Sequence, residues 1–202
     1  MLDRKTSSKT EILDAAANCF MELGSDVASI DDIARTLGAT KGRIYHHFSS
    51  KGALLSAVRM RAIMFILDEV TPIVNNSEAP INTLHDMAYT HVLKILETLP
   101  YHRVVLQHYR KNAAKSTTDY ERKLISEIEA KRQLYENLYR DILEQGMKTG
   151  DFIKRDISVA LHSVLLMLNS PVFWFTPLKK NERKNREEIA KQLADMAVAC
   201  LR

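Results

Sequence analysis

Apolar residues recur at helical spacing along almost the whole chain of 202 residues. No segment shows the alternation of apolar and polar residues that a half-buried strand needs, and the five prolines mark breaks between periodic segments. The predicted helices span residues 8–23, 30–37, 41–48, 51–70, 81–98, 101–114, 119–147, 156–170 and 185–201. The pattern therefore predicts an all-α fold, with a small module in residues 1–52 and a helical body in residues 53–202.

Capping signals support several of these helix boundaries. Two serines are followed three residues later by an acid, which is the spacing of a capping box, and glycines follow several of the periodic segments. The predicted start and stop residues are Ser8 and Gly24 for the first helix, Ser29 and Gly38 for the second, Gly146 and Gly150 at the end of the longest helix, and Asp156 for the helix after it.

The composition and the motifs exclude several classes of protein. A hydrophobic fraction of 46% and a charged fraction of 27% are ordinary for a soluble globular chain. No run approaches the ~18 apolar residues of a membrane span, and the N-terminal residues lack the apolar core of a signal peptide, so we expect a cytoplasmic protein without a membrane partner. The sequence has no glycine-rich phosphate loop, zinc signature or nucleophile–base pairing. We therefore expect no enzymatic activity, no cofactor and no metal site.

The segment from Ile30 to Phe48 has the spacing of a helix-turn-helix, with Gly38 in the turn. On a helical wheel, Ile44 and Phe48 point together toward a core, while Gly42, Arg43 and His46 are predicted on the opposite side with Tyr45 beside them. Such a second helix suits the major groove of DNA.

Basic charge is concentrated around this helix, although the net charge of the chain is only +4. No acid occurs from residue 33 to residue 67, whereas six lysines and arginines do. We predict that Arg43 reads a base and that Gly42 lets the backbone approach the DNA. The other predicted DNA contacts are Lys41 at the helix N-terminus and the phosphate contacts Ser29, Thr40, Tyr45, His46 and Lys51, with Arg4 and Lys5 forming a basic arm. A metal site at the adjacent His46 and His47 is not expected, because neighbouring helical residues point about 100° apart.

A larger set of residues keeps its spacing across this module. The set comprises Ile12-Leu13-Asp14-Ala15-Ala16, Phe20-Met21-Glu22-Leu23-Gly24, Ile33-Ala34, Gly38, Lys41-Gly42, Ile44-Tyr45, Phe48 and Lys51 with Leu54-Leu55. It resembles the DNA-binding domain of the TetR family of bacterial regulators, from which it departs at Ser25-Asp26 and Ser29. The resemblance implies about nine helices, a homodimer, a roughly palindromic operator in double-stranded DNA, and repression relieved by a small hydrophobic effector bound in the C-terminal domain.

Two apolar stripes near the C-terminus fit either the core or a dimer interface, and the resemblance favours the interface. They are Leu161, Val164, Leu165 and Leu168 in the helix 156–170, and Ile189, Leu193, Met196, Ala197 and Cys200 in the helix 185–201. The predicted effector-binding residues are Tyr89, Arg110, Tyr135, Tyr139, Asn169 and Trp174.

The segment 169–177, with 187–195, resembles the C-terminal signature of a TetR subgroup whose members sense acyl-CoA thioesters. In that subgroup Trp174 would pack beneath the effector cavity. Two alternatives stay open. The first is a DNA-binding protein of this fold that acts as an activator or through protein partners, and the second is a drug-responsive efflux repressor. A well-formed apolar cavity would argue against action through protein partners.

Overall fold

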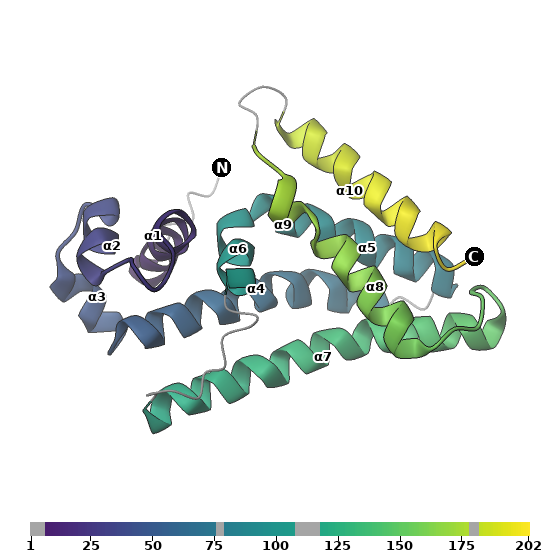
Figure 1. Cartoon of the computed structure of the whole chain (residues 1–202), viewed down its shortest axis with the longest axis horizontal. Helices are drawn as coiled ribbons and strands as arrows, with labels where there is room; N and C mark the ends of the chain where they lie inside the picture. The colour runs from purple at the N-terminus through teal and green to yellow at the C-terminus, as the bar shows by residue number, and fades with distance from the viewer. Residues whose placement is uncertain (1–6, 76–78, 108–117, 178–181) are drawn as a thin grey trace. The chain divides into compact units, whose positions relative to one another are not determined.

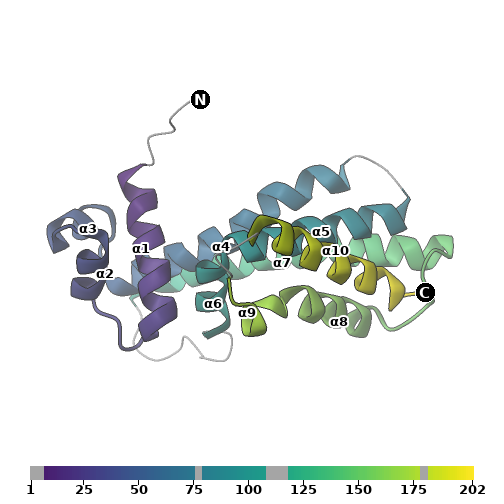
Figure 2. The ribbon, with the colours of Figure 1, turned by 90° about the horizontal axis from the view of Figure 1, so that it is seen from above.

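The computed structural model describes residues 7–75, 79–107, 118–177 and 182–202 (Figures 1 and 2). Every regular element in these ranges is a helix, so the all-α prediction is confirmed. The helices are α1 (Ser8–Leu23), α2 (Ile30–Leu37), α3 (Lys41–His47), α4 (Lys51–Val74), α5 (Pro80–Glu97), α6 (Leu99–Gln107), α7 (Asp119–Thr149), α8 (Ile157–Asn169), α9 (Pro171–Trp174) and α10 (Glu182–Ala199). The single-turn helix α9 was not predicted.

The chain forms two compact units. Unit 1 comprises Met1–Ala62 and Pro100–Glu129, and unit 2 comprises Ile63–Leu99 and Ala130–Arg202. Helices α4 and α7 contribute residues to both units. Each unit is therefore built from two separate segments of the chain.

Unit 1 contains the predicted helix-turn-helix, formed by α2 and α3. Ile44 and Phe48 are both buried, as predicted, and α2 contacts both α1 and α3. Gly38 ends α2 in the left-handed region at φ 65° and ψ 33°. Its N–H bonds the Arg35 carbonyl at 3.1 Å, and the next N–H bonds the Ala34 carbonyl at 2.9 Å, so the turn satisfies the end of the helix.

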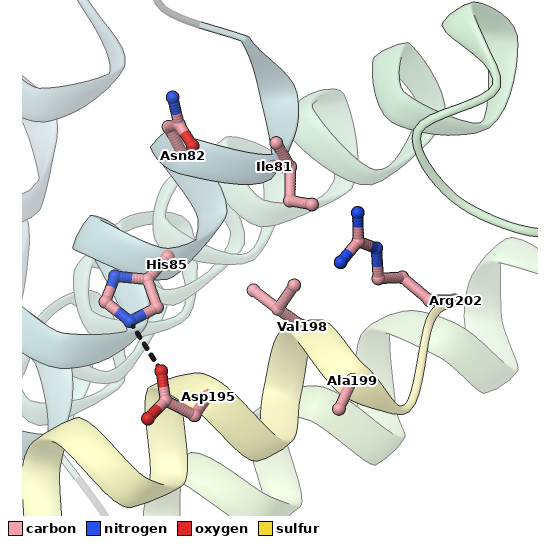
Figure 3. A pocket seen from close by; sticks show the side chains of 7 residues that line it. All are labelled: Ile81, Asn82, His85, Asp195, Val198, Ala199 and Arg202. Atoms are coloured by element: carbon pink, nitrogen blue, oxygen red, sulfur yellow. Dashed lines mark hydrogen bonds and ion pairs between the residues drawn. The ribbon is translucent and has the colours of Figure 1, made fainter.

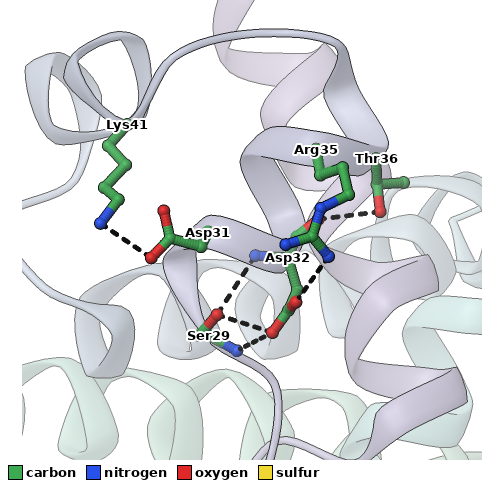
Figure 4. Close-up of polar contacts among 6 residues, drawn as sticks. All are labelled: Ser29, Asp31, Asp32, Arg35, Thr36 and Lys41. Carbon is green, nitrogen blue, oxygen red and sulfur yellow. Dashed lines mark hydrogen bonds and ion pairs between the residues drawn. The ribbon is translucent and has the colours of Figure 1, made fainter.

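The capping predictions hold for α2 and α8 but not for α1. Ser29 and Asp32 form the predicted capping box of α2 (Figure 4), and Asp156 caps α8 by accepting from two backbone N–H groups. The N-cap of α1 is Ser7, whose Oγ accepts from the Thr10 N–H at 3.3 Å, and not Ser8. Because Ser8 lies one residue inside the helix, its side chain is directed to a tertiary contact instead.

Two long-range hydrogen bonds attach α6 and α7 to the rest of unit 1. The Tyr101 hydroxyl of α6 donates to Asp14 Oδ1 of α1 at 2.5 Å. The Ser50 hydroxyl, which also caps α4, donates to Glu121 Oε1 of α7 at 2.8 Å. Gly52 leaves room for this carboxylate, since a Cβ at that position would overlap it.

Several predicted boundaries are wrong, including the start of α10, which lies at Glu182 instead of residue 185. Helix α4 continues through Pro72 to Val74, because a proline in the last turn removes only one backbone hydrogen bond. Gly146 lies inside α7, where the Phe152 ring packs against its Cα and a Cβ would overlap the ring, and the helix ends before Gly150 at φ 87°. Helix α6 begins at Leu99, and the predicted part of this helix beyond residue 107 lies outside the described residues.

In unit 2, α10 packs chiefly on α5 (Figure 1). The buried residues of α10 are small, namely Ala190, Ala194 and Ala197, so the two helices approach closely. On α8 the predicted stripe of Leu161, Val164, Leu165 and Leu168 is buried within the unit. These four leucines and valines therefore belong to the core and do not form the dimer surface that the resemblance suggested.

By length and composition alone, one window of the described chain passes as a membrane span. It covers Ile157–Trp174 and was overlooked in the sequence. The window is not one continuous helix, since α8 ends at Asn169 and α9 begins at Pro171. Its buried stripe packs against other helices of unit 2, which is the arrangement of a core helix.

Candidate nucleic-acid interface and effector site

Helix α3 presents an exposed face on unit 1. Lys41, Gly42, Tyr45 and His46 are exposed, whereas Ile44 on the other side of the helix is fully buried. At Gly42 a Cβ would meet only Thr40 Oγ1, at 3.7 Å, so the backbone is accessible there. Thr40 is the N-cap of α3 but makes no side-chain capping hydrogen bond. The face therefore offers an open stretch of backbone flanked by polar side chains, as a groove-binding helix does.

The prediction that Arg43 lies opposite Ile44 is wrong. Arg43 lies on the side of α3 that faces α1. Its Nε donates to Ser8 Oγ at 3.1 Å, and its terminal nitrogen forms an ion pair with Glu11. His47 Nε2 lies 3.2 Å from the same serine oxygen. The 100° step between neighbouring helical residues places Arg43 beside the buried face rather than across from it.

Lys41 also has an acidic partner inside unit 1. Its Nζ lies 2.7 Å from Asp31 Oδ2 of α2 (Figure 4). The hydrogen bond from the ammonium to this carboxylate, together with the charge attraction, raises the pKa of Lys41 above its ordinary value. The ammonium is therefore held at the start of α3.

Two of the residues predicted to contact phosphates, Lys51 and Ser29, make hydrogen bonds within unit 1 instead. Lys51 donates to the Ala28 carbonyl at 2.9 Å and to the Asp26 carbonyl at 3.4 Å. The Ser29 hydroxyl donates to Asp32 Oδ2 at 2.6 Å, so it is not the exposed donor that the sequence suggested. The hydrogen bonds that the Asp32 carboxylate accepts from the Ser29 hydroxyl and the Ser29 backbone N–H lower the pKa of Asp32.

The predicted basic arm, Arg4 and Lys5, lies outside the described residues. His46 and His47 contact each other edge to face at 5.1 Å between ring centroids. Among the residues that the structure describes, no group of three or more histidines, cysteines or acids is arranged to hold a metal ion.

Sequence reasoning missed the partners of the two cations, Glu11 and Asp31. Both acids lie in first turns of helices, where local sequence rules assign them to capping or to the helix dipole. No local signal identifies a contact between residues 32 positions apart in the chain. Only the fold of unit 1, in which α2 packs on both α1 and α3, brings Glu11 to Arg43.

In unit 2, three of the predicted effector residues meet around His91 of α5. The Tyr135 hydroxyl lies 2.9 Å from His91 Nδ1, and the Tyr139 hydroxyl lies 3.1 Å from the same nitrogen. Tyr139 also donates to the Met87 carbonyl at 3.2 Å. Asn169 of α8 is a neighbour of Tyr135, and its Nδ2 donates to the Leu165 carbonyl at 2.6 Å. This set, which we call the tyrosine–histidine cluster, joins α5, α7 and α8.

Burial dominates the chemistry of the cluster. Tyr139 and His91 are fully buried. Desolvation raises the pKa of the Tyr139 phenol, and the same effect, reinforced by Tyr139 and Glu136, raises that of Tyr135. Both phenols therefore remain neutral hydrogen-bonding groups. His91 was missed, although its spacing from the buried Met87, Ala88 and Ile95 would have placed it on the inner face of α5.

The other predicted effector residues are not part of this cluster. Tyr89 is half-buried two positions before His91, which places it about 200° around the helix from it. Trp174 is 53% exposed and donates to Ser170 Oγ at 3.3 Å, so it does not pack beneath a cavity. Arg110 lies outside the described residues.

An open groove of about 320 Å³ lies elsewhere in unit 2, between α5 and α10 (Figure 3). It is lined by Ile81, Asn82, His85, Asp195, Val198, Ala199 and Arg202. His85 Nε2 lies 3.0 Å from Asp195 Oδ1, so a polar contact occupies one side of the groove. None of the predicted effector residues lines it.

Unit 2 also exposes large apolar side chains on its last helices. On α8 and α9 they are Val159, Leu166, Phe173 and Trp174, and Met196 is exposed on α10. Of the stripe predicted on α10, Ala197 is buried, Ile189 and Leu193 are half-buried, and Met196 and Cys200 are exposed. Exposed apolar side chains in such number on neighbouring elements are typical of an interaction surface.

Comparisons with known proteins agree with both units. Residues 12–58 match the family model described as bacterial regulatory proteins, tetR family, and residues 77–201 match the model described as tetracyclin repressor-like, C-terminal domain. The HTH-type transcriptional repressor KstR2 of Mycobacterium tuberculosis (strain ATCC 25618 / H37Rv) is 25% identical over 155 residues, covering 77% of this chain and 74% of the relative.

Solved structures of similar fold cover nearly the whole chain. The TetR family transcriptional regulator PfmR from Thermus thermophilus is 29% identical with a TM-score of 0.77, covering 93% of this chain and 97% of that one. AibR, solved in complex with isovaleryl coenzyme A and operator DNA, is 22% identical with a TM-score of 0.75, covering 96% and 98%. At 22% identity the second likeness shows the fold alone.

Proposed function

The chain belongs to the tetR family of bacterial regulatory proteins, and from that premise we propose that it is a homodimeric, ligand-responsive repressor of a palindromic operator. The observation that carries this proposal is the exposed face of α3, where Gly42 leaves the backbone open between Thr40, Tyr45 and His46. We propose that Arg43 reads a base after turning from α1. The proposed phosphate contacts are Lys41, Thr40, Tyr45 and His46, with Ser29 and Lys51 at the edge of the interface.

The Arg43→Ala variant tests the base-reading role. We expect it to bind about tenfold more weakly to a duplex that the wild-type protein has selected from a random pool, because a bidentate arginine–guanine contact contributes about 1–3 kcal/mol. Base preference should relax at one position of each half-site. Fluorescence anisotropy measures the affinity, and a repeated selection measures the preference.

The matched control is Arg35→Ala, which removes the same charge from an exposed position on α2. It should leave the selected sequence unchanged. Wild-type affinity and wild-type base preference in Arg43→Ala would contradict the assignment of Arg43.

We propose that the dimer forms through the exposed apolar side chains of α8, α9 and α10. Leu166 and Phe173 are 66% and 68% exposed, and the outward stripe of α10 runs from Ile189 to Cys200 with Leu193 and Met196 between them. A two-fold dimer buries each such side chain twice, since the same patch faces itself. Two recognition helices then meet half-sites about one helical turn of DNA apart.

For the effector, we propose a small hydrophobic molecule recognised at the tyrosine–histidine cluster, with an acyl-CoA thioester as the first class to test. Two neutral phenols and an imidazole supply hydrogen-bonding groups in an otherwise apolar interior, which is the usual composition of a small-molecule site. A thioester carbonyl is an acceptor that a phenol can serve. Tyr135, which is less deeply buried than Tyr139, is the phenol that an effector would reach first.

A panel of acyl-CoA thioesters of increasing chain length, with free coenzyme A and unrelated drugs as comparators, tests the effector class. We expect a thioester to release the protein from its selected duplex, and the Tyr135→Phe variant to need about tenfold more of it while binding DNA as tightly as wild type. Release by drugs alone would replace the thioester proposal with a drug-responsive repressor. Release by no compound would favour a regulator that acts through protein partners.

A further inference from the structure

Both cations of the recognition helix are held by carboxylates from other helices of unit 1. Arg43 is paired with Glu11 of α1, and Lys41 is paired with Asp31 of α2. Neither pair lies within α3 itself, so each ties the recognition helix to a neighbour. All four side chains are partly exposed, at the surface where the DNA is proposed to bind.

The Arg43 contact uses the groups that DNA recognition needs. Nε donates to Ser8 and a terminal nitrogen donates to Glu11, so the guanidinium lies against the first turn of α1. A bidentate contact to guanine uses two N–H groups of the same guanidinium. Only two of the five N–H donors are used on α1, but these contacts hold the guanidinium against α1, so Arg43 has to turn away from Glu11 to direct it at a base or a phosphate.

We infer that Glu11 is a competitor of DNA for Arg43, and that it sets the affinity of the protein for DNA without touching the DNA itself. An exposed ion pair is weak in water, so exchanging the carboxylate for a phosphate or a guanine is easy. Glu11 then weakens binding to sequences that offer Arg43 no better acceptor than this carboxylate. This is a specificity device that works by disfavouring the wrong partner. The inference rests on the proposed DNA-binding role of α3.

The test is the Glu11→Gln variant, measured by anisotropy on a random-sequence duplex of about 20 base pairs at fixed salt. We expect it to bind about threefold to fivefold more tightly than wild type, because Arg43 no longer has to be withdrawn from a carboxylate. In the Arg43→Ala background the same substitution should gain less than about twofold, since only the general repulsion between Glu11 and phosphates is left to remove. Thermal melts of each variant show whether the module remains folded.

The second ion pair provides a crossed control. In the Lys41→Ala background, the gain in affinity from Glu11→Gln should keep its full size. Asp31→Asn, which removes the partner of Lys41, should also raise the affinity. That second gain should shrink in the Lys41→Ala background and persist in the Arg43→Ala background. Glu22→Gln, an exposed substitution near the other end of α1, should leave the affinity unchanged.

Equal gains from Glu11→Gln with and without Arg43 would overturn the inference, because the effect would then be general charge removal. A loss of affinity in Glu11→Gln would also overturn it and would make Glu11 a positioning residue for Arg43. These failures differ from failure of the proposed function, in which the wild-type protein selects no DNA sequence from a random pool.

Discussion

Replacing Leu166 with glutamate is expected to turn the proposed dimer into a monomer. Leu166 is 66% exposed on α8, so the substitution costs the isolated chain little, as most surface substitutions do. In a two-fold dimer the same change places two carboxylates against apolar surface, once from each copy. Burial of an unpaired charge costs several kcal/mol, which exceeds the effect expected for any other variant proposed for this protein.

Sedimentation equilibrium over a range of protein concentrations measures the dissociation constant, and circular dichroism checks the fold. The matched control is Val27→Glu, because Val27 is 76% exposed in unit 1 and receives the same chemical change. It should remain a dimer. If Leu166→Glu associates as wild type does, the exposed side chains of α8 are not the interface.

Lowering the pH from 6.5 to 4.5 is expected to cost the protein about 2 kcal/mol of stability through His102 alone. This histidine of α6 is 6% exposed, and burial lowers its pKa to about 3. In the unfolded chain its pKa is about 6.5. Above that value both states are neutral and the histidine has no effect. Below it the unfolded state binds a proton that the folded state refuses, which costs about 1.4 kcal/mol per pH unit until the pH approaches 3.

Urea unfolding at fixed protein concentration, repeated between pH 7.5 and pH 4.5, measures this slope. The His102→Gln variant should lose about 2 kcal/mol less than wild type between pH 6.5 and 4.5, whatever its stability at neutral pH. His46→Gln, the same substitution at an exposed site on α3, controls for the change of residue type. Identical slopes for wild type and His102→Gln would show that burial of His102 does not set the acid sensitivity.

Local rules predicted the elements whose ends are determined by their own residues. The capping box of Ser29 and Asp32 and the left-handed turn at Gly38 both follow from a few neighbouring residues, and both are present. Gly146 was misread because its role depends on Phe152, which packs against it after the chain has turned back. A helix-stop glycine and a close-packing glycine are the same letter in a sequence.

Helical spacing also identified apolar stripes but not what each stripe contacts. On α8, Leu161 and Leu168 lie in the core, while Leu166 on the same helix is exposed. The buried and the exposed leucines each belong to an apolar stripe at helical spacing. A helix with two apolar faces gives no signal in its sequence for which face is buried. The arrangement of neighbouring helices decides which face is buried.

The candidate sites show the same division. Tyr135 and Tyr139 were predicted as effector residues from their spacing on one long helix, and they do meet, but their common partner is His91 on another helix. Arg43 was placed by the wheel of α3 alone, and its orientation is determined by Glu11 on α1. Contacts between helices distant in sequence were therefore the part that a single sequence did not reveal.

The alanine-lined contact between α5 and α10 has an entropic consequence. Alanine has no side-chain torsion to freeze, so packing Ala190, Ala194 and Ala197 against α5 costs no rotamer freedom and leaves α10 little room to shift. The outward stripe of α10, from Ile189 to Cys200, is consequently held in one arrangement in the unbound chain. A preorganised surface loses less freedom on association, so it gains affinity without additional contacts.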